Sequence, residues 1–151
     1  MLKQIYVING PNLNLLGTRE TEIYGDQNLK DIEESSIIEA KKHKFNLKFL
    51  QSNKEGLIVD WIQEASKEAK GIIINAAGYT HTSIAIMDAL IACNIPVIEL
   101  HISNIYKRED FRKHSYISRA STGIICGFGT NGYSLAINAM SNILNDGLRD
   151  G

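Results

Sequence analysis

The sequence is poor in the residues that mark several large protein classes. It has two cysteines and two prolines in 151 residues. Cys93 and Cys126 lie far apart in apolar stretches without a CxxC spacing, which indicates buried thiols rather than a disulfide, a redox motif or a metal site. No apolar run approaches the ~20 residues that span a bilayer, and the segment MLKQIYVING has too short an apolar run for a secretory signal. We therefore expect a cytoplasmic protein with no membrane partner.

An excess of either charge is also lacking. Lys and Arg number 16 against 17 Asp and Glu, for a formal net charge of -1. Binding to a nucleic-acid backbone requires a basic surplus, so we expect no nucleic-acid partner. A chain of this length buries roughly two-thirds of its unfolded surface in one core. With no Pro/Gly/Ser linker and no internal repeat, residues 1–151 are expected to form a single catalytic domain.

Short apolar, β-branched runs alternate with segments of helical periodicity. The runs cover residues 4–8, 47–50, 71–74, 97–100 and 123–126, and each is short enough for a strand covered on both faces. Between them, apolar faces of helices are marked by Leu29, Ile32, Ser36 and Ala40, by Leu57, Ile58, Trp61, Ile62, Ala65 and Ala69, and by the segments 82–92 and 133–144. Ser52 and Asn53 precede the second helix and are candidate caps.

Strict alternation of strands and helices predicts an α/β fold with a doubly wound, parallel sheet. Five strands in flavodoxin-like order is the arrangement we expect. Pro11 follows the first strand and Pro96 precedes the fourth, where neither removes a donor from the centre of a strand. Ligands of such sheets bind beyond the carboxyl ends of the strands.

Polar segments follow the predicted strands at that edge. They are GPNLNLLGTRETEIYG (10–25), NAAGYTHTS (75–83), ELHISN (99–104) with IYKREDFRKHSYIS (105–118), and GFGTNGYS (127–134). Glu99 and His101 are two residues apart at the end of a strand, so their side chains share a face if both remain extended. A carboxylate can orient an imidazole and raise its proton affinity, as a general acid near neutral pH requires. The alternative is a polar pair that merely closes the strand end.

Three other patterns at this edge have competing interpretations. His81, His101 and His114 with Glu99 are conceivable metal ligands, but no HExxH or close Cys/His spacing supports a metal site. The glycines of GFGTNG match GxGxxG, yet no strand with an acidic residue follows, so a tight turn that lets a helix pack closely is favoured over dinucleotide binding.

The third pattern is Arg19 with Tyr24 in the first long loop. Tyrosine ionises near pH ~10, so it acts as a base only beside a cation that stabilises the phenolate. Arg19 can supply that cation, although an isolated loop tyrosine is more often a packing or binding residue.

Taken in order, these blocks resemble the type II 3-dehydroquinate dehydratases over nearly the whole chain. The matching runs are GPNLNLLGTRETEIYG, QSNKEG, INAAGYTHTS, ELHISNIYKREDFRKHSYIS and GFGTNGYSLA. The resemblance implies conversion of 3-dehydroquinate to 3-dehydroshikimate through an enolate or enol, without a cofactor. It also implies a homo-oligomer, a dodecamer built from trimers.

The resemblance further implies roles for individual residues. Tyr24 would remove the α-proton as a tyrosinate with Arg19 lowering its pKa on a mobile lid, in which Thr21 stands where many relatives have proline. His101 would protonate the departing hydroxyl while Glu99 holds its imidazole. The implied binding residues are Asn12 for a water at the enolate oxygen, Ile102 and Ser103 for the substrate carboxylate, Asn75, His81 and Arg112 for the ring hydroxyls, and Asp88 from a neighbouring subunit.

Two further interpretations remain open from the sequence. A flavodoxin-like binder of a nucleotide or flavin would use the glycine turn at 127–132. A non-enzymatic interaction domain would use the polar loops as docking surfaces. A lysine Schiff base, the route of the unrelated type I enzymes, is a rival mechanism for the same dehydration.

Overall fold

The computed structural model describes residues 2–18, 22 and 26–146. In these ranges the chain forms one parallel sheet of five strands in the order β2-β1-β3-β4-β5. The strands are β1 (Lys3–Asn9), β2 (Phe45–Gln51), β3 (Gly71–Asn75), β4 (Val97–His101) and β5 (Gly123–Cys126). This is the flavodoxin-like order, so the predicted fold class is confirmed. The predicted strands were one or two residues too short at most of their ends.

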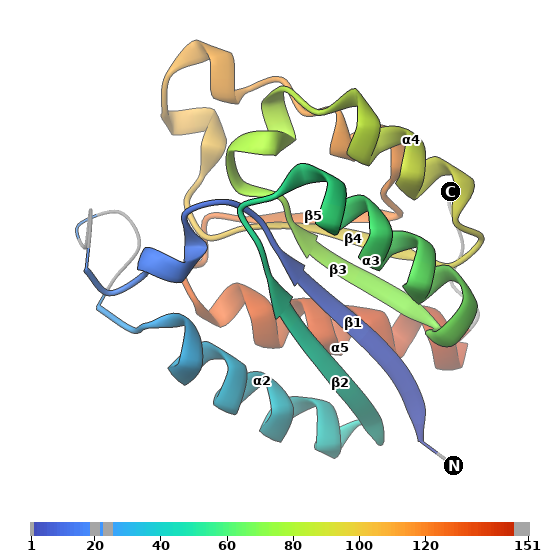
Figure 1. The fold of residues 1–151 in the computed structure, drawn as a ribbon. Coiled ribbons are helices and arrows are strands. Elements are labelled where there is room, and N and C mark those ends of the chain that lie inside the picture. Colours follow the sequence, from blue (N-terminus) through green and yellow to red (C-terminus); the bar gives the residue numbers. More distant parts are fainter. Residues whose placement is uncertain (1, 19–21, 23–25, 147–151) are drawn as a thin grey trace.

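Helices cover both faces of the sheet (Figure 1). Helices α2 (Leu29–Lys42) and α5 (Asn131–Asp146) lie on one face, and α3 (Glu55–Glu68) and α4 (Ile84–Ala92) lie on the other. Short 3-10 turns occupy the connections: η1 (Leu13–Leu15), η2 (Ala77–His81), η3 (Ile105–Lys107), η4 (Asp110–Arg112) and η5 (Ile117–Ala120). The fold is therefore a three-layer sandwich with a buried central sheet.

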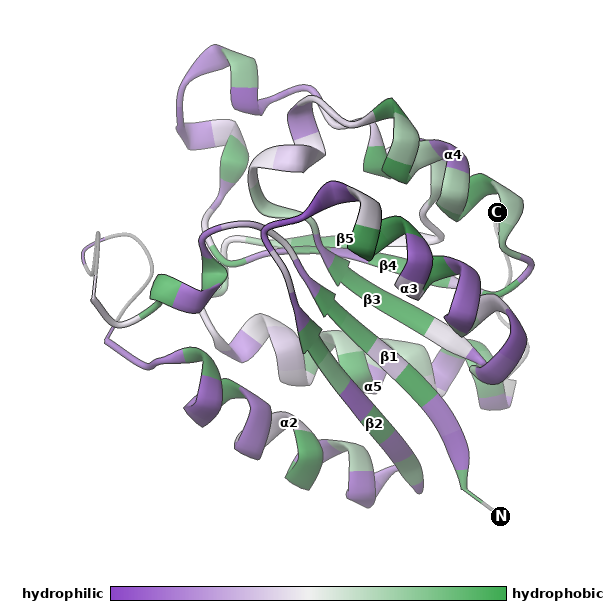
Figure 2. Ribbon diagram, viewed as in Figure 1, coloured by the Kyte–Doolittle hydropathy of each residue, from purple (hydrophilic) through white to green (hydrophobic). Residues whose placement is uncertain are grey.

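Alternation along the strands divides the interior into two cores. Ile5 and Val7 of β1 pack with α2 and α5, whereas Tyr6 and Ile8 pack with α3 and α4. Figure 2 shows the consequence, because α2 and α3 are hydrophilic on their outer sides while the inner strands are largely hydrophobic. Among the described residues, no helix has the length and apolarity needed to cross a membrane.

The buried face of α2 agrees with the sequence prediction, whereas the N-cap of α3 does not. Helix α2 buries Ile32, Ser36 and Ala40, as its periodicity predicts, and begins with a reciprocal capping box between Asn28 and Asp31. The expected cap of α3 by Ser52 or Asn53 is wrong. Lys54 is the N-cap and makes no side-chain cap bond, because the Ser52 hydroxyl accepts from the Lys54 amide in a local turn instead.

The carboxyl ends of the strands gather the polar connections at one edge. In Figure 1 this edge carries η1, the turn η2 after β3, and the η3–η4 segment after β4. Pro11 follows β1 and Pro96 precedes β4, as expected. Cys93 is buried and Cys126 half-buried, and both are free thiols. The polar side chains that could carry chemistry are thus gathered at the predicted ligand-binding edge.

Candidate active site

A hollow of about 130 Å³ opens at the carboxyl edge of the sheet. It brings together many of the residues selected from the sequence, namely Asn12, Asn75, His81, His101, Ile102, Ser103 and Arg112. Its other lining residues are Pro11, Leu13, Leu16, Ala77, Gly78, Ile105 and Arg108. Arg19, Thr21 and Tyr24 lie outside the described residues. Asp88 is on the exposed side of α4 and does not line this hollow.

His101 and Glu99 form a buried pair at the end of β4. Glu99 Oε2 lies 2.5 Å from His101 Nε2, and the two side chains are 1% and 5% exposed. A carboxylate only accepts, so Nε2 carries the hydrogen and the neutral ring is held as the Nε2–H tautomer. Nδ1 is left to exchange a proton with a ligand. The predicted common face of these two residues is therefore present.

The Glu99 carboxylate is stabilised as an anion despite its burial. Burial alone would raise the pKa of Glu99, but hydrogen bonds from His101, Ser118 and Ser115 together outweigh it and hold the pKa below its usual range. Ser115 Oγ donates to Oε2 at 2.8 Å, and Ser118 Oγ donates to Oε1 at 2.5 Å. The sequence reasoning did not select these serines. Their signal was weak, since they lie 16 and 19 residues from Glu99.

His81 also lines the hollow and is kept neutral there. Burial lowers the pKa of His81, and the nearby charges of His101 and Arg112 lower it further. Its Nδ1 lies 2.7 Å from the backbone carbonyl of His114. A carbonyl only accepts, so Nδ1 carries the hydrogen and Nε2 is an acceptor. His81 is thus suited to accept a hydrogen bond from a hydroxyl group.

Asn75 is fixed by a buried hydrogen-bond chain. Its Nδ2 donates to Tyr133 Oη at 3.2 Å, Tyr133 Oη donates to Asn9 Oδ1 at 2.6 Å, and Asn9 Nδ2 donates to the carbonyl of Leu50 at 3.0 Å. Burial raises the pKa of Tyr133, so its hydroxyl remains a donor. The sequence analysis missed Tyr133 and Asn9, although Asn9 is a polar residue that ends an apolar strand.

Two residues of the rim have left-handed backbone conformations. Asn12 has φ 70° and Ala77 has φ 53°. Asparagine tolerates this region, whereas alanine is strained there. The Asn12 amide donates to Asn53 Oδ1 at 2.9 Å, and the Ala77 amide donates to Asn75 Oδ1 at 3.2 Å. These contacts hold both turns against the hollow.

Two guanidinium groups make the hollow suitable for an anion. Arg112 Nε donates to Glu109 Oε1 at 3.2 Å, and Arg108 Nη1 donates to Ser103 Oγ at 3.3 Å. Arg108 Nε also lies 3.7 Å from Glu109 Oε1. Arg108 was not selected from the sequence, although it stands four residues before Arg112 in the same basic segment.

The glycine turn after β5 serves packing and strand alignment. Gly127 and Gly129 have φ 92° and 63°, and a Cβ on Gly132 would lie 2.8 Å from Leu100 Cδ1. The Gly127 amide donates to the carbonyl of His101, and the Gly129 amide donates to that of Ile102. Amides that would face a phosphate in a dinucleotide site instead hold the end of β4. This favours the close-packing interpretation of the GxGxxG pattern.

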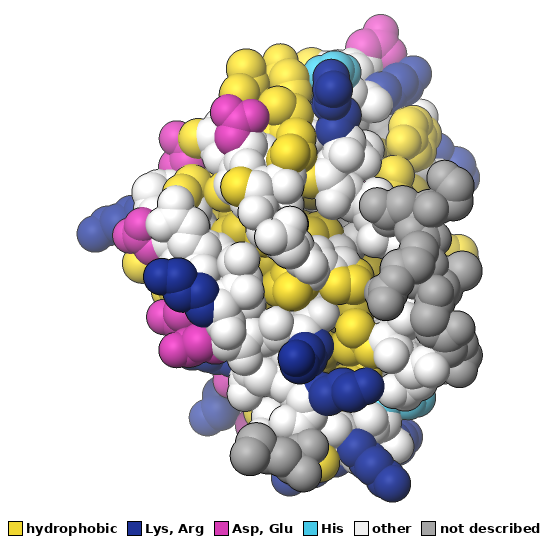
Figure 3. Space-filling view, turned by 90° about the vertical axis from the view of Figure 1, so that its right-hand side faces the viewer, with side chains coloured by type: hydrophobic (Ala, Val, Ile, Leu, Met, Phe, Trp, Pro, Cys, Tyr) yellow, Lys and Arg dark blue, Asp and Glu magenta, His cyan; other side chains and the backbone are white. Residues whose placement is uncertain are grey.

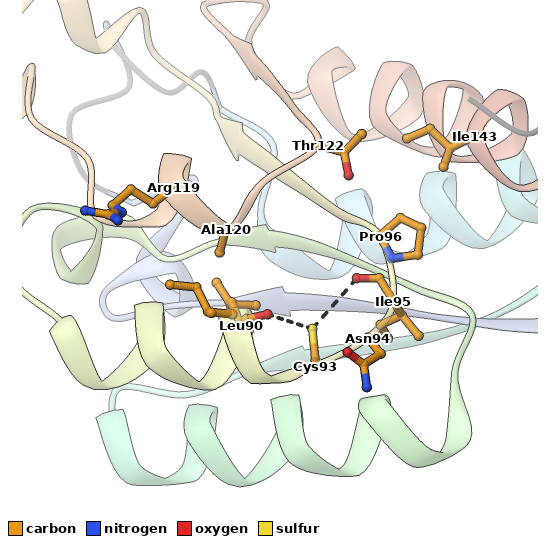
Figure 4. A pocket seen from close by; sticks show the side chains of 10 residues that line it. Leu90, Cys93, Asn94, Ile95, Pro96, Arg119, Ala120, Thr122 and Ile143 are labelled. Atoms are coloured by element: carbon orange, nitrogen blue, oxygen red, sulfur yellow. Dashed lines mark hydrogen bonds between the residues drawn. The ribbon is translucent and has the colours of Figure 1, made fainter. Parts of the chain in front are cut away.

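A larger hollow, about 590 Å³, lies at the other edge, where β4 and β5 begin. Figure 4 shows Leu90, Ile95, Pro96 and Ile143 among its lining residues, with Arg119 to one side. Cys93 Sγ donates to the carbonyl of Leu90 at 3.0 Å, and burial raises the pKa of this thiol. Figure 3, viewed from this side, shows hydrophobic side chains gathered over the upper and central part of the face. Its described lining residues include no carboxylate, so it lacks the acid–base pairing found at the smaller hollow.

The smaller hollow combines an acid, hydrogen-bond donors and positive charge. When its ring is protonated, His101 can donate from Nδ1 while Glu99 holds Nε2. Arg108 and Arg112 favour an anionic group, and Asn75 with His81 offers a donor and an acceptor for hydroxyls. Such an arrangement suits the removal of a hydroxyl group as water from a carboxylate-bearing, polyhydroxylated molecule.

Comparisons with known proteins agree in family and fold. Residues 3–141 match the family described as Dehydroquinase class II. The chain is 58% identical over 140 residues to the 3-dehydroquinate dehydratase of Buchnera aphidicola subsp. Acyrthosiphon pisum (strain APS), covering 93% of each chain.

Two crystal structures share the whole architecture. The type II dehydroquinase from Butyrivibrio crossotus DSM 2876 superposes with TM-score 0.90 at 44% identity, over 92% of this chain and 97% of that one. The type II dehydroquinase from Propionibacterium acnes gives TM-score 0.91 at 41% identity, over 94% and 98%.

Proposed function

The chain belongs to the class II dehydroquinase family and is a 3-dehydroquinate dehydratase, a hydro-lyase; we propose that it eliminates water through an enolate with Tyr24 as base and His101 as acid. The observation that carries this mechanism is the buried Glu99–His101 pair, whose imidazole lines a hollow together with Arg108 and Arg112. Of the interpretations open from the sequence, a nucleotide or flavin binder has no support from the glycine turn, whose amides bond the end of β4.

The proposed reaction needs one base, one acid and no cofactor. The phenolate of Tyr24 takes the acidic proton beside the substrate ketone, and the electron pair of that C–H bond moves to the carbonyl oxygen as an enolate. When the enolate collapses, the C–O bond of the β-hydroxyl breaks and His101 Nδ1 gives that oxygen a proton, so water leaves. No hydride is transferred, and each of the two proton transfers typically contributes about 10²- to 10⁴-fold.

The base remains a proposal that rests on the family resemblance. Arg19 would lower the pKa of Tyr24 by stabilising the phenolate. Asn12 would hold a water at the enolate oxygen. Its backbone is left-handed, and its amide donates to Asn53 Oδ1, which together fix the position of its Cα–Cβ bond.

For the substrate carboxylate we propose the backbone amides of Ile102 and Ser103 with the Ser103 hydroxyl. Arg108 supports this role, because its Nη1 donates to Ser103 Oγ and leaves the serine hydrogen available for an anion. Asn75, His81 and Arg112 would bind the ring hydroxyls, with neutral His81 accepting at Nε2.

We also propose a homo-oligomer, a dodecamer built from trimers, in which Asp88 reaches a neighbouring subunit's site. Asp88 lies on the outer face of α4 between Ile84 and Ile91, each of which is 53% exposed. Apolar side chains that flank an exposed acid suit a subunit contact. A cytoplasmic location is proposed as well, and the two free thiols are consistent with a reducing compartment.

The test follows the conjugated-enone absorbance that grows when purified protein meets 3-dehydroquinate. Wild type should turn over at an unchanged rate after metal chelation. Tyr24→Phe should abolish turnover while the circular dichroism spectrum stays native, and Tyr106→Phe is a matched control because Tyr106 is 52% exposed and does not line the hollow. Near-normal turnover of Tyr24→Phe would remove Tyr24 from the role of base. Borohydride in the presence of substrate should trap no imine; trapping would support the Schiff-base route.

A further inference from the structure

We propose that Ser115 and Ser118 are positioning residues for the dehydration, because they fix the Glu99 carboxylate so that it holds the acid His101. This inference rests on the proposed function of Glu99 and His101. Neither serine lines the hollow, so neither is expected to touch the substrate.

The two serines bind different oxygens of one carboxylate. Ser115 Oγ donates to Glu99 Oε2 at 2.8 Å, and Ser118 Oγ donates to Oε1 at 2.5 Å. The terminal torsion of a glutamate is otherwise broad and roughly two-fold. With one donor on each oxygen, the plane of the carboxylate is fixed and Oε2 remains directed at His101 Nε2.

The direction of each serine hydrogen bond follows from the surrounding contacts. The Ser118 amide donates to Ser115 Oγ at 3.1 Å, which occupies a lone pair of that oxygen and leaves its hydrogen for Glu99. An ionised carboxylate can only accept, so both hydroxyls must act as donors. Together with His101 they make three hydrogen bonds to a nearly fully buried anion.

The serines are held by a well-anchored segment. Ser118 lies in η5 beside Ile117, which is fully buried, and the Tyr116 amide donates to the carbonyl of Thr80 at 3.0 Å. The same stretch of chain carries Arg112 in η4. One segment therefore carries both Arg112, the cation proposed above for the ring hydroxyls, and the two serines that bind Glu99.

Steady-state kinetics of serine variants test the proposal. Ser118→Ala should lower kcat by about 10- to 100-fold with KM within about twofold, because positioning of a proton donor acts on the chemical step. Ser118→Thr keeps the hydroxyl and should restore most of the loss. Ser115→Ala should lower kcat in the same way as Ser118→Ala. It replaces Ser118→Ala in the test if Ser118→Ala folds poorly. Ser121→Ala is the matched control, since Ser121 Oγ donates to the carbonyl of Ile117 in the same segment and should leave kcat unchanged.

The decisive comparison places Ser118→Ala in a Glu99→Gln background. If the serine acts through Glu99, its substitution should change kcat by less than about twofold there, because interacting residues are non-additive. An equal loss in both backgrounds, or no loss in wild type, overturns the proposal.

A second measurement does not depend on turnover. Nitrogen-15 NMR of histidine-labelled protein reports the ring tautomer, with His101 assigned by its absence in His101→Asn. Neutral His101 should be the Nε2–H tautomer in wild type and a mixture in the Ser115→Ala/Ser118→Ala protein. An unchanged tautomer in the double variant would overturn the positioning role of the serines. Failure of the wild type to dehydrate 3-dehydroquinate would instead count against the proposed function. The two failures are therefore distinguishable.

Discussion

Removal of one buried hydroxyl, that of Tyr133, should destabilise the whole fold. Tyr133 is 1% exposed and its hydroxyl links Asn9 on β1 with Asn75 on β3. In Tyr133→Phe the ring still fills its space, so the change isolates the hydrogen bonds. Asn9 Oδ1 and Asn75 Nδ2 are left facing a hydrocarbon, and their residues are 0% and 3% exposed.

The expected loss of stability follows from the two polar groups that lose their hydrogen-bond partner, Asn9 Oδ1 and Asn75 Nδ2. Each buried donor or acceptor that loses its partner costs about 1–3 kcal/mol, so the two groups together should lower the free energy of unfolding by about 2–6 kcal/mol. With a denaturant slope of about 2 kcal/mol per molar urea, the unfolding midpoint should fall by about 1–3 M. Because Asn75 also loses its support, KM should rise.

Urea unfolding followed by circular dichroism, at one fixed protomer concentration, measures the effect. Tyr6→Phe is the matched control. Tyr6 is equally buried, but its hydroxyl donates to Glu64 and Glu68, and Glu64 is 39% exposed, so water can replace the lost bond. A loss below about 1 kcal/mol in Tyr133→Phe, or an equal loss in both variants, would refute the reasoning.

Two further predictions concern the cationic side of the hollow. Burial lowers the pKa of His81, so the folded state binds fewer protons than the unfolded state as the pH falls below about 6.5, and stability decreases there. His81→Gln should flatten that decrease in urea melts between about pH 7.5 and pH 5.5; an unchanged slope would count against it. Arg112→Ala should raise KM about 10- to 100-fold, the worth of a charge-assisted hydrogen bond, with Arg112→Lys intermediate. Lys113→Ala, at the exposed neighbouring position, is its control, and an equal rise there would contradict a specific role for Arg112.

The sequence predicted the fold better than the contacts within the site. Runs of apolar residues located every strand, because burial on both faces leaves a strong local signal. The shared face of Glu99 and His101 followed from the period of a strand. Ser115, Ser118 and Tyr133 were missed because their partners lie 16 to 124 residues away, and only the folded topology brings them together. The cap of α3 was misjudged for a local reason, since Ser52 bonds the amide two residues on instead.

The hollow places opposed demands on its two histidines. Arg108 and Arg112 supply positive charge for an anionic substrate, and positive charge disfavours a protonated imidazole. The pKa of His81 is lowered mainly by burial, with smaller contributions from the charges of His101 and Arg112, and its Nδ1 meets a carbonyl rather than a carboxylate. His101 lines the same hollow but has Glu99 at 2.5 Å on its far side. Since Coulomb interactions weaken with distance, a carboxylate behind the ring adds little repulsion towards an anion in the hollow. The buried position of Glu99 therefore lets a carboxylate orient the imidazole from behind without opposing the binding of an anion in the hollow.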